Sequence, residues 1–372
     1  MIITLGRVSE KKWNTALAEA GTNGTIFQST YWAEYLRKAF GDRPIYIASL
    51  DKKGEIRGLL LATESCYAKH SASTLLGKRG LVLSRMYRQI ASPLFHKVCP
   101  FIFWENGPIV LPKSLEEESC KAVYSEIIFQ AIAYAQKRGC YGIRFARPAF
   151  FDDKFEIWSS LGFQQRRMGT MLIDLENPPE VLWKRIDYHA RRNINKMEKE
   201  LVIVEVSGLK ELAEFYRMHV HSARRTGTKH YPFSFFRSLW NSLSPSGKIV
   251  GFIACFKDRT VGGSISLAHN RVVHEYAHGD SDYARQNRIY PLDALKWHTM
   301  KWAHEHNFKY FDLSGVELHK IESGDEKAIN IYRFKSKWGG QLVEYHDYTM
   351  KLWDRRIVRL LNRFMVDSIV HN

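Results

Sequence analysis

The chain has 372 residues, of which 45% are hydrophobic and 13% aromatic, so it can build hydrophobic cores and does not have the composition of a disordered chain. Its length suits two domains better than one compact core. The 55 Lys and Arg residues against 39 Asp and Glu give a net charge of +16, which favours an anionic partner: nucleic acid, a phosphorylated small molecule or an acidic membrane surface.

No run of about 18 apolar residues occurs, which excludes a membrane-spanning helix. The N-terminus lacks the basic head and apolar stretch of a secretory signal. The five cysteines are dispersed without C-x-x-C spacing, which indicates reduced thiols rather than a zinc site. We therefore expect a cytoplasmic protein without a metal.

Two stretches, residues 45–62 and 251–268, share one pattern: an apolar run, a charged turn, a β-branched residue, a glycine and a second apolar run. This pattern is typical of a hairpin of two half-buried strands. After each hairpin, a helical apolar spacing stops at Gly139 or Asn307 and an aromatic-rich strand follows. We therefore expect two similar α+β domains, residues 1–168 and 169–350, each a mixed twisted sheet flanked by helices. The alternative is the ordinary rhythm of any α/β chain.

Between the two copies, the apolar spacing predicts one helix that begins at Pro178 and Pro179. Its apolar side comprises Leu182, Ile186, Ala190, Ile194 and Met197. A different side carries a row of five potential cations, Arg185, His189, Arg192, Lys196 and Lys199. Such a row repels itself unless anions lie across it. We interpret it as an anion site, and a solvated face with partners elsewhere is the alternative.

The sequence contains no G-x-S-x-G motif, no P-loop and no G-x-G-x-x-G motif that opens a helix. The doubled α+β unit suggests a pair of acetyltransferase-like (GNAT) domains. That fold normally binds the pyrophosphate of coenzyme A with a Q/R-x-x-G-x-G/A loop at a helix N-terminus. The corresponding loop here is R-Q-N-R-I-Y, in which Arg288 and Tyr290 stand at the glycine positions. Their side chains hinder close backbone approach, so acyl-CoA is not the expected donor.

Seven motifs follow one another between about Thr25 and Tyr348. They are I-F-Q-S-T-Y-W-A, N-G-P-I-V-L, A-R-R-N-I-N-K, H-E-Y-A-H-G-D-S, I-Y-P-L-D-A-L-K-W, F-D-L-S-G and R-F-K-S-K-W-G-G. In their order and spacing, the chain resembles the Fem family of peptidoglycan-bridge ligases, which are tandem GNAT-like proteins that use aminoacyl-tRNA as donor. No long helical hairpin interrupts the second domain, so the chain is similar to the short members of that family.

The resemblance implies that Phe334 and Lys335 are catalytic and lie at the donor site. An amine that attacks an aminoacyl ester leaves negative charge on the carbonyl oxygen, which a fixed ammonium group stabilises. Phe334 could stack on the terminal adenine of a tRNA. Arg333 and Lys337 are expected to meet phosphates. The alternative for this segment is a basic sheet edge with core aromatics.

The remaining candidate substrate-binding residues have different expected roles. Arg191, Arg192 and Lys196 are expected to contact anionic groups, and Tyr276 and Tyr290 to offer hydroxyl groups, with a place in the core as the alternative for both tyrosines. The base that deprotonates the acceptor amine is the substrate itself, water or Asp312, and the other expected role of Asp312 is to fix a strand end.

In the first domain, Trp32 and Arg37 are expected to bind substrate. Two departures from the family pattern leave the acceptor open. Leu36 stands where members acting on UDP-linked muropeptides carry a lysine, and Leu111 and Pro112 replace a frequent acidic residue.

The predicted function is aminoacyl transfer from aminoacyl-tRNA to an amine of a peptidoglycan-type cell-envelope precursor or a related peptide, without a resident cofactor. The expected partners are the tRNA acceptor end and an anionic peptide, nucleotide-linked or lipid-linked acceptor, and we favour a monomer. The alternatives are an N-acyltransferase that uses acetyl-CoA on an amino sugar or peptide, and a non-catalytic RNA-binding protein. Residues 351–372 predict a basic amphipathic helix, which either packs on its own domain or lies on the inner face of the membrane.

Overall fold

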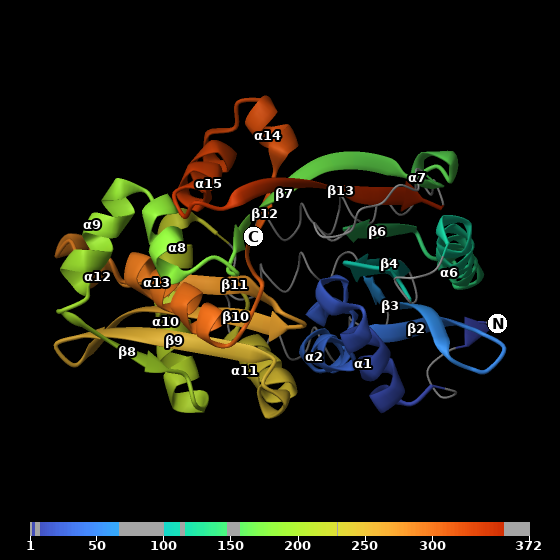
Figure 1. Cartoon of the computed structure of the whole chain (residues 1–372), viewed down its shortest axis with the longest axis horizontal. Helices are drawn as coiled ribbons and strands as arrows, with labels where there is room; N and C mark the ends of the chain where they lie inside the picture. Colours follow the sequence, from blue (N-terminus) through green and yellow to red (C-terminus); the bar gives the residue numbers. More distant parts are fainter. Residues whose placement is uncertain are drawn as a thin grey trace, which may run out of the picture. The chain divides into compact units, whose positions relative to one another are not determined.

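The computed structural model describes residues 2–3, 8–66, 100–111, 116–146, 157–228 and 230–352 (Figure 1). The chain forms two compact units. Unit 1 comprises Met1–Gln165 and Asp347–Asn372, and unit 2 comprises Arg166–His346. Strand β13 (Gln341–Lys351) belongs to unit 2 at its start and to unit 1 at its end.

Unit 1 is a mixed sheet with helices. Its described helices are α1 (Glu10–Glu19), α2 (Thr30–Phe40), α6 (Glu117–Lys137) and α7 (Ile157–Ser160). Its strands are β1 (Ile2–Ile3), β2 (Arg43–Leu50), β3 (Ile56–Cys66), β4 (Pro100–Glu105), β5 (Ile109–Val110) and β6 (Gly142–Ala146). The strand order is β1-β2-β3-β4-β6, β5 pairs with β3, and the end of β13 pairs with β6. The core of this unit lies between α6 and the sheet, around Trp104, Phe145 and Trp158.

Unit 2 has the same plan, and more helices are described in it. They are α8 (Pro179–Arg185), α9 (Tyr188–Met197), α10 (Leu209–Thr226), α11 (Phe233–Leu243), α12 (Asp282–Gln286), α13 (Pro291–Glu305), α14 (Leu318–Glu322) and α15 (Glu326–Ser336). The strands are β7 (Gln164–Asp174), β8 (Leu201–Glu205), β9 (Ile249–Phe256), β10 (Arg259–His269), β11 (Val272–Asp280) and β12 (Tyr310–Val316), in the order β7-β12-β11-β10-β9-β8.

Two neighbouring glycines of β10 show that α10 and α13 cover opposite faces of this sheet. A Cβ atom on Gly263 would meet Phe215 of α10 at 3.1 Å, whereas one on Gly262 would meet Pro291 of α13 at 2.6 Å. Successive residues of a strand point to opposite faces, so one helix packs on each side.

The repeated pattern predicted from the sequence is confirmed. The two hairpins are β2–β3 and β9–β10, and both are antiparallel. The two helix-then-strand pairs are α6–β6 and α13–β12. Gly139 and Asn307 end their helices in left-handed conformations, with φ of 64° and 60°. The chain is thus an α+β protein with two tandem GNAT-like units.

The single helix predicted after Pro178 is wrong, because two helices, α8 and α9, stand in its place. The chain breaks at Ile186 and Asp187, where the Asp187 carboxylate accepts a hydrogen bond of 2.8 Å from the His189 N–H and caps α9. The predicted apolar side is nevertheless buried in both helices. The break interrupts the row of cations that a continuous helix would have carried.

The parallel strands of the two units differ in how far they stay paired. In unit 1, residues 102–105 of β4 pair with 143–146 of β6, and the Asn106 N–H continues the ladder to the Ala146 carbonyl at 2.8 Å. In unit 2, only residues 272–274 of β11 pair with 310–312 of β12. Beyond that point β11 pairs with β10 and β12 pairs with β7. The two strands therefore separate after His274 and Asp312.

The amphipathic helix predicted for residues 351–372 lies outside the described residues, apart from Lys351, which ends β13, and Leu352. No helix in the described part of the chain has the length and apolar character needed to cross a bilayer.

Candidate active site

The basic and aromatic segment at residues 330–340 is the end of α15 and the turn that follows it, not a sheet edge. Trp338 is buried in the core of unit 2. Gly339 has φ of 71°, and a Cβ atom there would lie 2.5 Å from the Cβ atom of Arg185 and 2.6 Å from its carbonyl oxygen. Glycine is therefore required where this turn passes the end of α8.

The Lys335 ammonium group lies where β11 and β12 separate. It donates hydrogen bonds to the carbonyl oxygens of Ser314, at 3.1 Å, and Gly315, at 2.8 Å. Burial lowers the pKa of Lys335 to about 8; Lys296 adds to this effect, and Glu275 and Asp312 oppose it. Within the described residues, no carboxylate forms an ion pair with this group. The site thus holds a half-buried, hydrogen-bonded cation whose charge no described carboxylate cancels by direct contact.

A bulge in β12 presents these two carbonyl groups. Leu313 and Ser314 together stand opposite one residue of β7, and Ser314 has φ of 66°. The Asp312 carboxylate accepts a hydrogen bond from the Ser314 N–H at 2.8 Å. The Thr170 hydroxyl lies between the Asp312 carboxylate and the Ser314 carbonyl oxygen, 2.9 Å from the latter, and can donate to either. The bulge is therefore held from both sides.

Asp312 is also bound by His274, whose Nδ1 lies 3.0 Å from the second carboxylate oxygen. Burial by itself would raise the pKa of the Asp312 carboxyl, but the bonds from His274, Thr170 and the Ser314 N–H lower it overall. A carboxylate stabilised in this way is a poor base. The contacts of Asp312 favour the second of its two expected roles, which is to fix the strand.

Glu275 and Lys296 form a buried ion pair next to Phe334. Their side chains are 8% and 5% exposed. The Lys296 ammonium also lies 5.6 to 6.0 Å from the ring centroids of Phe311, Trp338 and Phe334. Burial would raise the pKa of Glu275, but Lys296 and His278 lower it well below its usual value. A cavity of about 10 Å³, room for about one water molecule, lies beside the pair.

The N-terminus of α13 is occupied by protein groups. Pro291, its first residue, has no N–H group, and Asp293 in the first turn is 6% exposed. The Asp293 carboxylate accepts from Lys337 at 2.6 Å and from the Asn193 amide at 2.8 Å. The Lys337 ammonium also lies 4.5 Å from the centroid of the Phe334 ring. Lys337 is therefore paired with a carboxylate and not free for a phosphate in this structure.

Three predicted residues lie on α9, and one of them, Lys196, contacts the loop that precedes α13. Lys196 donates to the Arg288 carbonyl at 3.2 Å, and its ammonium lies 5.7 Å from the Tyr290 ring. Arg192 is exposed, whereas the Nε atom of Arg191 is buried without a hydrogen-bond partner in the described part of the chain.

The other predicted residues are divided between the two units. In unit 2, Arg333 is exposed on α15 and Tyr276 is half-buried on β11. In unit 1, Arg37 is exposed and paired with Glu34 at 2.7 Å. Trp32 is 5% exposed and packs against other rings of the core, so its surroundings are those of a core residue.

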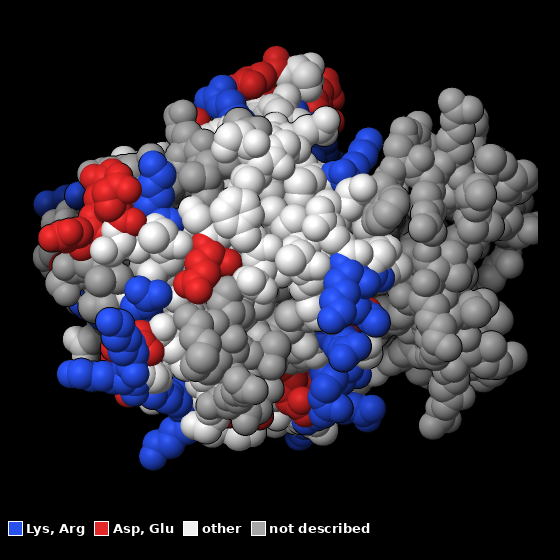
Figure 2. Space-filling view, turned by 90° about the vertical axis from the view of Figure 1, so that its right-hand side faces the viewer, with Lys and Arg blue, Asp and Glu red and all other residues white. Residues whose placement is uncertain are grey.

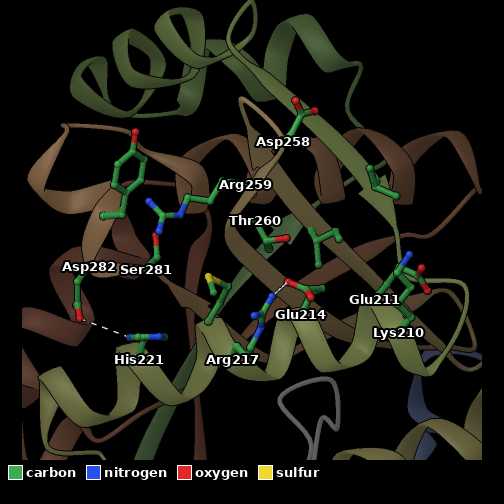
Figure 3. Close-up of a pocket in the computed structure, with 14 residues that line it drawn as sticks. Lys210, Glu211, Glu214, Arg217, His221, Asp258, Arg259, Thr260, Ser281 and Asp282 are labelled. Atoms are coloured by element: carbon green, nitrogen blue, oxygen red, sulfur yellow. Dashed lines mark hydrogen bonds and ion pairs between the residues drawn. The ribbon is translucent and has the colours of Figure 1, made fainter.

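A separate pocket of about 720 Å³ lies in unit 2 between α10 and the turn that joins β9 to β10 (Figure 3). Two pairs of its lining residues contact each other: Glu214 binds Arg217, and Asp282 lies 3.5 Å from His221. It contains none of the residues predicted from the sequence. Figure 2 shows one face of the molecule, on which Lys and Arg form several separate groups with Asp and Glu beside them. Among the described residues on this face, Lys and Arg do not form one continuous area.

Sequence reasoning missed Glu275, Lys296 and the β12 bulge. Glu275 and Lys296 lie within two of the quoted motifs, H-E-Y-A-H-G-D-S and I-Y-P-L-D-A-L-K-W. The signal available was the presence of charged residues in apolar surroundings. Nothing in the spacing indicated that a strand residue and a helix residue would pair with each other.

Comparison with known proteins places this chain among GNAT folds. Residues 184–336 match the acetyltransferase (GNAT) domain family. No curated protein matches the chain. The crystal structure of FemX is similar over 97% of this chain and 100% of that chain, with a TM-score of 0.71 and 14% sequence identity.

Two further solved structures share the fold. L-PGS from Bacillus licheniformis matches 95% of this chain and 96% of its own, with a TM-score of 0.53 and 13% identity. A tandem GNAT protein from the clavulanic acid biosynthesis pathway matches 95% and 99%, with a TM-score of 0.54 and 10% identity. At these identities the structures show the fold, and with the family match they support an acyltransferase.

Proposed function

We propose that this protein is an aminoacyltransferase that moves an amino acid from aminoacyl-tRNA to an amine of a cell-envelope precursor or a related peptide. The observation that carries the proposal is the Lys335 ammonium group at the point where β11 and β12 separate. It is partly buried and mostly charged below pH 8, and among the described residues it is bound only through backbone carbonyls, which leaves its charge for a developing oxyanion.

The proposed reaction needs no enzyme nucleophile, because the ester of an aminoacyl-tRNA is already activated. The acceptor nitrogen attacks the ester carbonyl carbon, and the carbonyl oxygen gains negative charge. Lys335 stabilises that oxygen, the bond to the ribose oxygen breaks, and an amide forms. Removal of one such stabilising group costs roughly 10²- to 10³-fold in kcat in enzymes that use them.

The N-terminus of α13 supports a donor other than acyl-CoA. A pyrophosphate bound there would meet the buried Asp293 carboxylate and a proline without an N–H group. Arg288, in the preceding loop, has φ of 51° and carries a large side chain where the GNAT loop has glycine. The fold shared with FemX and with an L-PGS structure is consistent with aminoacyl transfer.

The test is a transfer assay with tRNA charged with labelled amino acids and a panel of acceptors. The panel contains Nα-acetyl-lysine amide, lysine-containing peptides, glucosamine and hydroxylamine. We expect label to reach at least one acceptor, RNase treatment to abolish transfer, and Lys335→Met to reduce the rate by about 10²- to 10³-fold. His306→Gln, an exposed change at the end of α13, is the matched control. Transfer that persists undiminished in Lys335→Met would contradict the proposal.

A second candidate is an N-acyltransferase that uses acetyl-CoA, which the match to the acetyltransferase domain family favours. Isothermal titration calorimetry with acetyl-CoA separates the two. We expect no saturable binding. Tight binding together with acetyl transfer to glucosamine would replace the first proposal with the second.

A further inference from the structure

His278 and Glu275 form a histidine–carboxylate dyad beside Phe334. The Nδ1 atom of His278 lies 3.1 Å from a carboxylate oxygen of Glu275. The carboxylate is 8% exposed and the imidazole is 35% exposed. An ionised carboxylate only accepts hydrogen bonds, so Nδ1 carries the hydrogen and Nε2 carries the free electron pair. Nε2 has no hydrogen-bond partner among the described residues.

A bulge in β11 is what brings the two side chains together. Residues three apart in a regular strand point to opposite faces. Here Ser266 pairs with Glu275 and the preceding Ile265 pairs with Ala277, so Tyr276 is an extra residue in the ladder. The extra residue turns the strand by one position, and Glu275 and His278 share a face. Bulges of this kind are common beside active sites, where they re-aim a side chain.

Groups from three other elements hold the dyad in place. Lys296 of α13 is paired with Glu275, which keeps the carboxylate ionised. The ring of Phe334 on α15 lies 5.9 Å from the His278 ring, and Lys337 lies over that same phenylalanine. On α10, Nδ1 of His219 lies 3.1 Å from the backbone carbonyl of His278. The imidazole is therefore oriented by charged and aromatic neighbours and remains open to solvent on one side.

We propose that His278 is the general base that takes the proton from the acceptor amine during aminoacyl transfer, with Glu275 as its positioning residue. The inference rests on the proposed function. Phe334 is next to Lys335 in the chain, so the base and the oxyanion-stabilising cation border the same segment of α15. Among the described residues, the other candidate base, Asp312, fits less well, because its carboxylate is engaged in holding the β12 bulge.

The proton balance of this step is complete. The acceptor enters as a free amine, its nitrogen bonds to the ester carbonyl carbon, and the nitrogen becomes positively charged. The Nε2 atom of His278 takes one proton from that nitrogen. As the bond between the carbonyl carbon and the ribose oxygen breaks, the imidazolium gives the proton to that oxygen. The products are an amide and the free ribose hydroxyl, and the imidazole is neutral again.

The experiment compares two acceptors that differ in their need for a base. After attack, the nitrogen of either acceptor must lose a proton, but the nitrogen of hydroxylamine is much less basic than that of Nα-acetyl-lysine amide and gives its proton to water more readily. With charged tRNA as donor, His278→Gln is expected to lose about 10²- to 10⁴-fold in transfer to the amine and less than about tenfold in transfer to hydroxylamine.

Controls separate this inference from folding and from the proposed function. His306→Gln is the matched control, and His278→Ala is expected to regain amine transfer when free imidazole is added. Equal transfer by wild type and His278→Gln to both acceptors, with Lys335→Met still inactive, would overturn the base and leave the proposed function standing. Absence of tRNA-dependent transfer in the wild type to every acceptor of the panel would overturn both.

Discussion

The charge of Lys335 gives the proposed mechanism a pH dependence that can be calculated from the structure. Burial lowers the pKa of this group to about 8. The ammonium form is then about 90% populated at pH 7 and about 10% at pH 9. If the charged form stabilises the transition state, the rate falls about tenfold between these two pH values. A lysine with an ordinary pKa would stay charged across this whole range.

The assay measures initial rates of transfer from charged tRNA to hydroxylamine between pH 6.5 and about 9.5. Hydroxylamine is suited to it because its own protonation does not change in the region where Lys335 titrates. The background aminolysis and hydrolysis of the ester, measured without enzyme at each pH, are subtracted. Lys335→Arg provides the decisive comparison, because a guanidinium group keeps its charge at every pH of the series.

We expect the wild-type rate to decline above pH 8 and the Lys335→Arg rate to stay level. The arginine variant is expected to be slower at pH 7, since its planar head does not match the geometry of an ammonium group, so the comparison is between the shapes of the two curves. A wild-type rate that is flat up to pH 9.5, or a decline of the same steepness in the arginine variant, would refute the reasoning.

Three further predictions concern stability and are tested by urea unfolding. Gly339→Ala is expected to lower the free energy of unfolding by more than about 3 kcal/mol, because the left-handed φ adds to overlap of the new Cβ atom with backbone atoms. Gly324→Ala, with φ of 80° and open space around it, is expected to cost about 1–2 kcal/mol. Equal losses in the two variants would contradict the close approach of Gly339 to Arg185. Lys296→Met is expected to lower the free energy of unfolding by about 3–5 kcal/mol, because it leaves a buried carboxylate unpaired. Adding Glu275→Gln is expected to restore most of this loss. A double variant no more stable than Lys296→Met alone would contradict the ion pair. Lys335→Met is expected to raise the urea midpoint at pH 7. The pKa of this lysine is lower in the folded state than in the unfolded state, so its charge destabilises the fold below pH 8, and the gain in stability is expected to shrink as the pH rises from 8 towards 10. A gain in stability that grows over that pH range would contradict the prediction.

Much of the fold could be predicted because local patterns determine it. Apolar runs on either side of charged turns predicted the two hairpins, and Gly139 and Asn307 marked helix ends that the structure has. The break before α9 could not be found by periodicity, because the apolar spacing runs unchanged through Asp187. The chain becomes extended at Ile186, and the Asp187 carboxylate caps the start of a new helix, which the continuing apolar pattern does not show.

The site was harder to predict because its contacts join residues that are distant in the chain. The family resemblance made Lys335 a catalytic candidate, but nothing in the sequence showed that its partners would be carbonyl groups of a bulge at Ser314 and Gly315. The same holds for Glu275, whose two partners come from α13 and from beyond a bulge in its own strand. A resemblance transfers the position of a residue and not its surroundings, as the buried Trp32 illustrates.

The unequal pairing of the parallel strands bears on how the two units have diverged. Asn106 keeps the ladder closed in unit 1, whereas the corresponding ladder in unit 2 opens after three residues. If both units descend from one ancestral gene, catalysis needed to persist in only one of the two copies. The other copy could then accept substitutions that keep its parallel strands paired. Relatives of this chain should then tolerate changes at the end of β4 far more freely than at the end of β11, and a deep mutational scan under selection for activity would display that imbalance.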